Sequence, residues 1–462
     1  MGGSTVEELF TGSASAVAFD DGTELTTVEL WDDGCRVAAW LAADGVRRGD
    51  RVAARMANGP DYVRLLAACA AGGFVLVSVN TRYADAEADA LVHRSGARLT
   101  LTELTDSWRD VEPMSPVGTA DEPFVVFTTS GTTSAPKMVL HRQRSVADHA
   151  AEVAAAFGYD AGSVVLVVMP LCGTFGLASL AGALAGGSRT IVTDYDLTRT
   201  AELIESEQVT AMNGSDDLFH RLLERTADLS SLRLAGYARF NSSLDGIVER
   251  AAAAGATLTG LYGMSEVQAL FALRDPAGDA TDRSRAGGTL TSPHASYRIV
   301  DGELQVAGPS LFAGYLAEGG ERIDEELTAR HHDGAWFRTG DLAEPDDDRT
   351  FEFVARLGDA LRLGGFLVAP AEIEAVLMEV AGVTAAEVVA VDRPGGARAV
   401  AFVIAPDGFD EPAALERCRA RLAHYKVPVR VLTIDEFPTT PSANGTKIRK
   451  VELRDLATRA LT

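Results

Sequence analysis

The sequence predicts an α/β protein, in which a large N-terminal domain of helix-covered mixed β-sheets is followed by a smaller, mobile α+β lid domain. Up to residue 357, short apolar runs alternate with helical patterns, and this alternation favours a predominantly parallel arrangement of strands covered by helices. Beyond that point the chain is built differently, with two helical patterns set among short apolar strands. We therefore expect domains at 1–357 and 358–462.

The N-terminal domain is expected to open with a hairpin over residues 19–25 and then a helix. Thr26 and Glu29 form a capping box at the start of that helix, and Gly45 ends it. The same reading predicts strands at 52–56, 74–79, 99–101, 125–127, 164–168 and 210–212, and helices at 62–71, 84–93, 145–157 and 198–207.

The lid is expected to begin near Gly358. Pro370 stands where a helix starts, and Ile373, Val376 and Leu377 follow at helical spacing. The other elements expected in the lid are strands at 387–391, 400–404 and 429–434 and a helix around 415–422.

The composition excludes several classes of function. A formal net charge of −24 at pH 7 argues against a nucleic-acid or anionic-membrane partner. The uncharged stretch 161–188 is long enough to span a bilayer, but Pro170 and several glycines break it, so we interpret it as buried core. The four cysteines are scattered and no signal peptide is visible. We therefore expect a cytoplasmic protein with no membrane span.

Lysine is scarce in this chain, since only Lys137, Lys426, Lys447 and Lys450 occur. Arginine fills the other basic positions. A retained lysine can mark a site that needs a compact ammonium instead of a planar guanidinium, although chance placement is the alternative for each one.

A hydroxyl-rich loop follows the strand expected at 125–127. Six hydroxyl side chains surround Gly131, and the loop ends at Pro136 and Lys137; the hydroxyls are those of Thr128, Thr129, Ser130, Thr132, Thr133 and Ser134. Hydroxyls, backbone N–H groups freed by a glycine and one ammonium suit a polyphosphate. The alternative is an ordinary polar turn. The P-loop of NTPases is excluded because proline, not glycine, precedes Lys137.

This loop resembles the phosphate-binding signature of the adenylate-forming superfamily, which includes acyl-CoA synthetases and usually reads T-S-G-T-T-G-x-P-K-G. Ser134 and Met138 replace two of its glycines. The resemblance covers essentially the whole chain. It implies that ATP is bound by Thr129, Ser130, Gly131, Thr132, Thr133 and Lys137.

Two further stretches resemble the signatures of this superfamily that follow the loop. In the first, Tyr262-Gly263-Met264-Ser265-Glu266, the resemblance assigns Mg²⁺ to Glu266, the α-phosphate to Ser265 and the adenine to Tyr262. In the second, Thr339-Gly340-Asp341, it makes Asp341 the ribose anchor, with Arg356 beside it. A solvated glutamate and a simple turn are the alternatives for these two stretches.

The tail at 438–450 resembles the last signature of the superfamily, whose lysine crosses the gap between the domains. Lys447 is our candidate for this role. An ammonium about 4 Å from the charge that develops on the phosphate contributes roughly 4 kcal/mol at an effective dielectric constant near 20. Lys450 is expected at the surface, and Lys426 is given no chemistry.

The sequence departs from the superfamily pattern at three positions. Gly358 stands where the hinge residue is usually Asp or Lys, and Gly173 stands where a histidine is common. Arg239 is a large cation where glycine is usual. The first two departures leave the identity of the acceptor in the second half-reaction open.

By the same resemblance, the acyl pocket is expected to be lined by Phe175, Gly176, Asn213, Arg239, Phe240, Leu261 and Val267. Leu261 replaces a glycine that is common in aryl-CoA ligases, and its larger side chain should shorten the pocket on that side. We therefore expect a small or medium carboxylic acid, which could be aromatic.

The resemblance implies an ATP-dependent enzyme that converts a carboxylic acid to acyl-AMP and then to a CoA thioester. Two alternatives stay open: transfer to a carrier-protein thiol, an amine or another nucleophile, and a non-catalytic relative that only binds nucleotide. Neither the particular acid nor the oligomeric state follows from the sequence.

Overall fold

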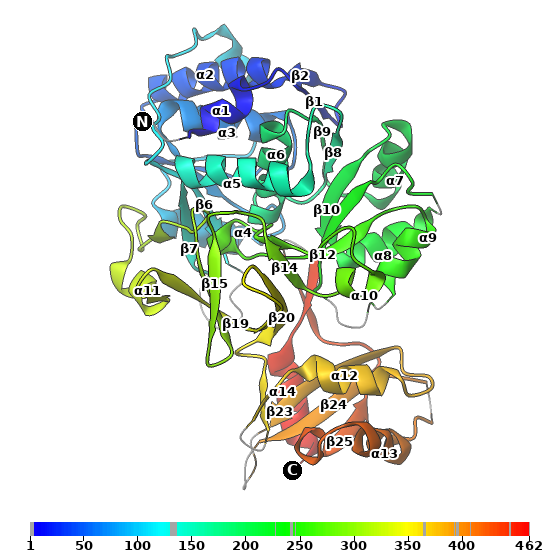
Figure 1. Ribbon diagram of the computed structural model, residues 1–462. Helices are drawn as coiled ribbons and strands as arrows, with labels where there is room; N and C mark the ends of the chain where they lie inside the picture. The colour runs from blue at the N-terminus through cyan, green and yellow to red at the C-terminus, as the bar shows by residue number, and fades with distance from the viewer. Residues whose placement is uncertain are drawn as a thin grey trace.

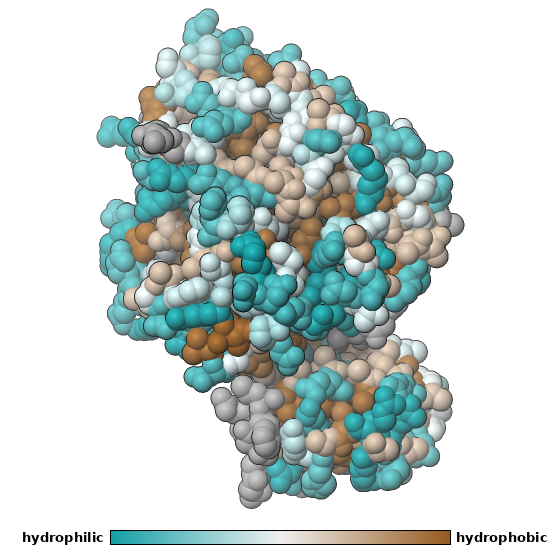
Figure 2. All heavy atoms as spheres, in the orientation of Figure 1, coloured by the Kyte–Doolittle hydropathy of each residue, from teal (hydrophilic) through white to brown (hydrophobic). Residues whose placement is uncertain are grey.

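The computed structural model describes residues 4–129, 136–226, 228–240, 244, 246–363, 366–391, 393, 397–406, 408–442 and 445–461. Figure 1 shows a large body, coloured from blue to yellow along the chain, and a smaller orange and red body below it. The surface seen in Figure 2 is mostly polar on both bodies, and apolar atoms are confined to small areas.

The larger sheet of the large body is mixed. Its strands are β1 (Ala16–Phe19), β2 (Glu24–Thr26), β8 (Val164–Val167), β9 (Arg189–Val192), β10 (Ala211–Ser215), β11 (Leu234–Ala238), β12 (Leu258–Tyr262), β13 (Ala272–Leu273), β14 (Gly287–Leu290), β15 (Ser296–Val300), β16 (Glu303–Ala307), β18 (His332–Asp333), β19 (Trp336–Pro345) and β20 (Thr350–Arg356). They lie in the order β15-β16-β19-β20-β14-β13-β12-β11-β10-β8-β9-β1-β2, with β18 paired to β19.

The direction of pairing in this sheet changes at β12. On the β1 side the neighbouring strands are parallel, apart from the β1–β2 hairpin. On the other side, from β13 to β15, every pair is antiparallel. The predicted mixed sheet is therefore confirmed, and this half is the part that departs from the parallel arrangement favoured by the alternation of strands and helices. Two of its pairs, β15–β16 and β19–β20, are hairpins with short connections, which only antiparallel neighbours allow, whereas a parallel pair needs a long crossover.

A second sheet holds the start of the hydroxyl-rich loop. Its strands are β3 (Arg51–Ala54), β4 (Val75–Ser78), β5 (Leu99–Leu101), β6 (Pro123–Thr128), β7 (Met138–Arg142) and β17 (Gly314–Tyr315), in the order β17-β7-β6-β4-β3-β5. The β6 and β7 strands are antiparallel neighbours, and the loop lies between them.

Helices cover both sheets. The longer ones are α2 (Thr27–Ala43), α3 (Pro60–Gly72), α4 (Asp85–Ser95), α5 (Gln143–Phe157), α6 (Thr174–Ala185), α7 (Leu197–Ser206) and α8 (Asp216–Arg225); the shorter ones are α1 (Val6–Thr11), α9 (Ile247–Ala253), α10 (Ala280–Arg283) and α11 (Glu325–Arg330). The capping box predicted at Thr26 and Glu29 is present. The apolar stretch 161–188 divides into β8, a turn and the buried α6, as expected. No helix among the described residues is long and apolar enough to cross a membrane.

The small body has apolar cores of its own, which contain only residues beyond 360. Its elements are β21 (Leu361–Leu363), β22 (Phe366–Val368), α12 (Pro370–Met378), β23 (Ala385–Val391), β24 (Arg398–Ile404), α13 (Glu411–Arg421), β25 (Arg430–Thr433), β26 (Thr439–Ser442), β27 (Gly445–Ile448) and α14 (Lys450–Ala460). Separate cores support the predicted joint near Gly358, although its exact position stays a prediction.

Candidate active site

Two backbone segments close the base of the hydroxyl-rich loop. The Thr129 N–H donates to the Lys137 carbonyl at 3.0 Å, and the Lys137 N–H donates to Thr129 Oγ1 at 3.2 Å. The loop therefore begins and ends at one point, with Lys137 at its base. The predicted phosphate ligands Ser130, Gly131, Thr132 and Thr133 lie outside the described residues.

The Lys137 ammonium has two partners from distant parts of the chain. Its Nζ lies 2.8 Å from His331 Nε2 and 4.8 Å from the centre of the Tyr315 ring. Burial lowers the pKa of Lys137, and the nearby Glu266 carboxylate opposes that shift. Burial, then the charge of Lys137, lowers the pKa of His331. A neutral His331 can accept a hydrogen bond from the ammonium.

Glu266 lies in the short 3₁₀ turn Ser265–Val267 that follows β12, and its side chain is buried. The Tyr315 hydroxyl donates to Glu266 Oε1 at 2.8 Å. Tyr315 thus contacts both the predicted loop lysine and the predicted metal carboxylate. The structure brings these two residues to one side chain, with the ammonium over the Tyr315 ring and the carboxylate at its hydroxyl.

The residues present fit a magnesium ion that arrives with ATP. Mg²⁺ in such sites takes one or two carboxylates from the protein and the rest of its ligands from phosphates and water. Glu266 supplies one such carboxylate. No group of three His, Cys, Asp or Glu side chains that could hold a metal ion exists in the described part of the chain.

Asp341, Tyr262 and Arg356 form a second cluster. The Tyr262 hydroxyl donates to Asp341 Oδ2 at 2.5 Å, and Arg356 Nε lies 3.0 Å from Asp341 Oδ1. This second contact is an ion pair and not a hydrogen bond. Oδ1 is buried and accepts no hydrogen bond. Burial raises the pKa of Asp341, and Arg356 opposes that shift. The cluster leaves Oδ1 with unused capacity to accept a hydrogen bond.

The part of β19 that carries Asp341 is held from β16. Glu303, which is buried, accepts a hydrogen bond from the Gly340 N–H at 3.2 Å, and the Thr339 hydroxyl donates to the Leu304 carbonyl at 2.7 Å. Gly340 has a φ of +72°, which favours glycine at this position. Glu303 was not among the predicted site residues.

The residues predicted to line the acyl pocket fall into two groups. Five are buried and closely packed, whereas Arg239 and Phe240 are exposed; the buried five are Phe175, Gly176, Asn213, Leu261 and Val267. Asn213 Nδ2 donates to Tyr159 Oη and to Ser179 Oγ, both at 3.1 Å. A Cβ atom at Gly236 would lie 2.6 Å from Asn213 Oδ1 and 3.0 Å from Leu261 Cδ2. This region therefore has little free space.

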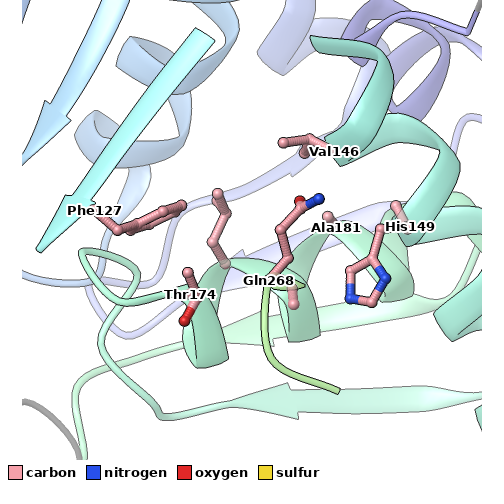
Figure 3. Close-up of a pocket in the computed structure, with 9 residues that line it drawn as sticks. Phe127, Val146, His149, Thr174, Ala181 and Gln268 are labelled. Atoms are coloured by element: carbon pink, nitrogen blue, oxygen red, sulfur yellow. The ribbon is translucent and has the colours of Figure 1, made fainter. Parts of the chain in front are cut away.

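A small cavity of about 10 Å³ lies between α5 and α6, beside the segment that follows Glu266 (Figure 3). It holds roughly one water molecule. Its wall includes polar side chains from three elements and is otherwise apolar; the lining residues are Phe127, Val146, His149, Ala150, Thr174, Leu177, Ala178, Ala181 and Gln268.

The predicted lid lysine lies on the hairpin formed by β26 and β27, in which Lys447 pairs with Thr440. Figure 1 shows this red hairpin extending from the small body toward the large one. The side chain of Lys447 and the residues Gly364 and Gly365 lie outside the described part of the structure.

Sequence reasoning missed Tyr315 and His331, although both contact predicted site residues. Tyr315 is 49 residues from Glu266, and His331 is 194 residues from Lys137. No local spacing links such distant residues. The histidine pair His331-His332 just before the Thr-Gly-Asp stretch is the one signal that could have drawn attention.

Comparison with known proteins gives consistent results along the chain. The AMP-binding enzyme family matches residues 9–117 and 102–316, and the AMP-binding enzyme C-terminal domain matches residues 372–444. A feruloyl-CoA synthase from Amycolatopsis is 32% identical, with 94% of each chain covered. A 2-succinylbenzoate–CoA ligase from Bacillus licheniformis is 27% identical over 91% of this chain and 93% of its own.

Solved structures share the whole fold. The ATP-bound MatB from Rhodopseudomonas palustris superposes with a TM-score of 0.86, covering 99% of this chain and 100% of its own at 23% identity. The o-succinylbenzoate CoA synthetase from Bacillus subtilis, in complex with its acyl-adenylate intermediate, gives a TM-score of 0.83, covering 97% of each chain at 23% identity. With both family matches in chain order and a relative at 32% identity along nearly its full length, this protein belongs to the AMP-binding enzyme family.

Proposed function

We propose that this protein is an AMP-forming acid–thiol ligase. In the first half-reaction, a carboxylate oxygen attacks the α-phosphorus of ATP, the bond to the β-phosphate oxygen breaks, and pyrophosphate leaves. In the second, the thiol sulfur of CoA attacks the acyl carbonyl, its proton is lost, and AMP leaves. The observation that carries this proposal is the contact of Lys137 and Glu266 with one residue, Tyr315.

We assign the residues to roles as follows. Lys137 and the loop from Thr129 to Thr133 bind the phosphates, and Ser265 contacts the α-phosphate. Asp341 accepts from the ribose hydroxyls, which suits a buried carboxylate with an unused lone pair. Tyr262 packs at the adenine, and Arg356 stays beside Asp341. Glu266 would hold Mg²⁺, which neutralises phosphate charge when it is bound.

The lid completes the site in this proposal. Lys447 enters from the β26–β27 hairpin and places its ammonium against the charge that develops on the α-phosphate. Gly358 is the proposed hinge between 1–357 and 358–462. It is exposed, and a Cβ atom there would meet nothing within 4 Å, so no side-chain packing restrains this position; its carbonyl accepts a hydrogen bond from Arg454 at 3.3 Å. A second closure would bring Gly364 and Gly365 to the pantetheine.

The proposed acid is small or medium in size, with aromatic acids included. The packing of Leu261 and Asn213 about Gly236 supports a short pocket. The name of the feruloyl-CoA synthase relative supports an aromatic acid. We also propose a cytoplasmic location, where ATP and CoA would both be at hand.

An ATP–pyrophosphate exchange assay over a panel of carboxylates, from acetate to hydroxycinnamates, tests the first half-reaction. We expect exchange with at least one member of the panel and CoA-dependent thioester formation with the same acid. Folded protein that exchanges with no acid would contradict the proposal.

An acceptor of the acyl group other than CoA is the alternative, because Gly173 stands where a histidine is common in the superfamily. It lies at the N-cap of α6, next to the predicted acyl pocket. Mass spectrometry of the products formed with CoA, a carrier protein and small amines offered together would identify the acceptor. A CoA thioester as the main product supports the first assignment, and any other adduct supports the alternative.

A further inference from the structure

The segment that carries Glu266 has an unusual backbone. Gln268, Ala269 and Leu270 follow Glu266 in the chain, and all three are left-handed, with φ values of 64°, 53° and 43°. A residue with a Cβ is disfavoured in this conformation, and three in a row are rare. Such a turn persists only where its surroundings over-determine it. The contacts that hold it are therefore informative.

His141 fixes the start of the segment from Ser265 to Leu270, which contains both Glu266 and this turn. It lies on β7, the strand that begins directly after Lys137, and its ring is buried. His141 Nε2 lies 2.8 Å from the carbonyl oxygen of Ser265. Because a carbonyl only accepts, the contact is a hydrogen bond only if Nε2 carries the proton. A direct hydrogen bond thus joins the strand of the phosphate-loop lysine to the residue before Glu266.

His149 fixes the far part of the same segment, at Ala269. It projects from α5 beside the segment that carries Gln268 (Figure 3), and it is also buried. Its Nε2 lies 3.0 Å from the carbonyl oxygen of Ala269. Burial lowers the pKa of both histidines, to about 3 for His141 and about 4 for His149, so both rings are neutral at pH 7.

Additional contacts secure the middle of the turn. Gln268 Nε2 donates to the carbonyls of Ser145 and Ser310, at 2.8 and 3.1 Å. The Phe312 N–H donates to the Glu266 carbonyl at 2.9 Å. The carbonyls of Ser265 and Ala269 are therefore engaged by histidine, and the residues between them are held through the Gln268 side chain and the Phe312 N–H.

We propose that His141 and His149 are positioning residues for Glu266: they donate their Nε2–H groups to the carbonyls of Ser265 and Ala269, on either side of Glu266, and together they hold the carboxylate at the nucleotide site. Neither ring touches the phosphates in this assignment. The inference rests on the proposed function, in which Glu266 holds the Mg²⁺ that arrives with ATP.

The test uses the full-length protein and compares two substitutions at each histidine. Leucine fills much of the ring volume but cannot donate, so His141→Leu and His149→Leu remove the hydrogen bond. Glutamine carries an N–H at about the position of Nε2, so His141→Gln and His149→Gln restore it. His220→Leu is the matched control, because His220 lies on α8 and contacts Arg250 and Glu224 instead of the turn.

The main measurement is the gain in ATP affinity that Mg²⁺ produces. Calorimetry gives the Kd of ATP with EDTA and the Kd of ATP with Mg²⁺, and the gain is the first value divided by the second. We expect this gain to fall at least tenfold in each leucine variant and to stay within about threefold of wild type in the glutamine variants and in His220→Leu. The melting temperature is measured for every variant, so that a loss of stability is recorded separately.

Leucine variants that melt earlier but keep the full Mg²⁺-dependent gain would overturn the inference and leave the histidines purely structural. If those variants do not fold, Gln268→Met removes two donors from the same turn and is judged by the same criterion. Wild-type protein with no Mg²⁺-dependent gain would instead contradict the proposed function, and the inference with it.

Discussion

Asp341 is a buried carboxylate whose two oxygens have different surroundings. Oδ2 accepts from the Tyr262 hydroxyl, whereas Oδ1 accepts no hydrogen bond even though Arg356 is near. A buried acceptor that receives no hydrogen bond is costly to the folded protein, and the ion pair with Arg356 offsets part of that cost. Such a cost is expected at a place where a ligand supplies the missing donor.

Replacing this carboxylate gives the first prediction. Asp341→Asn should raise the KM for ATP by about ten- to a hundredfold, because a hydrogen bond to a charged acceptor contributes about 1.5–3 kcal/mol. The measurement is steady-state exchange at varied ATP. Glu344→Gln, an exposed carboxylate on the same strand, should leave the KM within error. Equal KM values for wild type and Asp341→Asn would remove Asp341 from the nucleotide site.

Lys447 gives the second prediction. Lys447→Ala should slow ATP–pyrophosphate exchange by about three powers of ten, since about 4 kcal/mol of charge stabilisation is lost from the transition state. Nucleotide should still bind, because the phosphate loop lies on the large body. Single-turnover exchange and calorimetry measure the two effects separately. A variant that loses binding and exchange together would speak against a role confined to the transition state.

The predictable site residues are those that stand in short local patterns. Glu266, Asp341 and Lys137 were predicted because each belongs to a stretch of a few residues with recognisable chemistry. Tyr315, His331 and the two turn-holding histidines were missed because their partners lie 49 to 194 residues away. Only folding determines which distant side chains meet, so no periodicity in the sequence records these contacts.

At the scale of elements, the left-handed turn after Glu266 balances strain against hydrogen bonds. Three left-handed residues with a Cβ cost roughly 1–2 kcal/mol each. Each buried hydrogen bond to the turn contributes about 1 kcal/mol. The bonds from His141, His149 and Gln268 together are therefore of the size needed to offset the strain.

The third prediction concerns acid stability. The pKa values of His141 and His149 are about 3 and 4 in the folded protein, against about 6.5 for an unfolded histidine. The unfolded chain therefore binds protons that the folded one does not, and stability conferred by the neutral rings is present above pH 6.5 and lost as the pH falls through 4 and 3. Each ring adds a slope of about 1.4 kcal/mol per pH unit in this window.

Urea unfolding of the large domain at pH steps from 7 to 4.5 measures that slope. The double variant His141→Gln/His149→Gln should show a shallower loss of stability than wild type over this range, because glutamine does not titrate. Identical slopes would mean that other groups dominate the acid response. His220→Gln is the matched control and should keep the wild-type slope.

The hinge gives the fourth prediction. A Cβ at Gly358 would meet no atom within 4 Å, so Gly358→Ala should fold normally. Alanine restricts the backbone by roughly 0.5–1 kcal/mol relative to glycine, so the thioester half-reaction should slow by about two- to fivefold. The adenylation half-reaction should change less. Stopped-flow measurement of each half-reaction distinguishes the two, and equal slowing of both would argue against a hinge at this residue.

The elements that the sequence predicted well are those with a clear start or period. The capping box at Thr26 begins α2, and Pro370 begins α12, as expected. Apart from the strand that ends near Phe353, the antiparallel strands from β13 to β19 were not predicted, and several of them, such as β13 and β18, are only two residues long. Tertiary pairing forms such strands, and local propensity does not.

At the scale of the whole molecule, ligand binding and stability are linked. A ligand that binds only the folded state at a hundred times its Kd adds about 2.7 kcal/mol to the free energy of unfolding. For a domain of this size that amounts to roughly 3–5 °C in melting temperature. The fifth prediction is that MgATP gives a shift of this order, and that ATP with EDTA gives a smaller one. Thermal-shift measurement checks both, and Lys137→Ala should reduce the response to each.

The close packing about Gly236 bears on any effort to change which acid the enzyme accepts. A side chain at position 236 would collide with Asn213 and Leu261, and Phe157 lies 3.0 Å from the same point. Trimming Leu261 to alanine or glycine, by contrast, opens volume without moving the backbone. A redesign library should therefore vary position 261 first, keep glycine at 236, and screen with progressively longer acids.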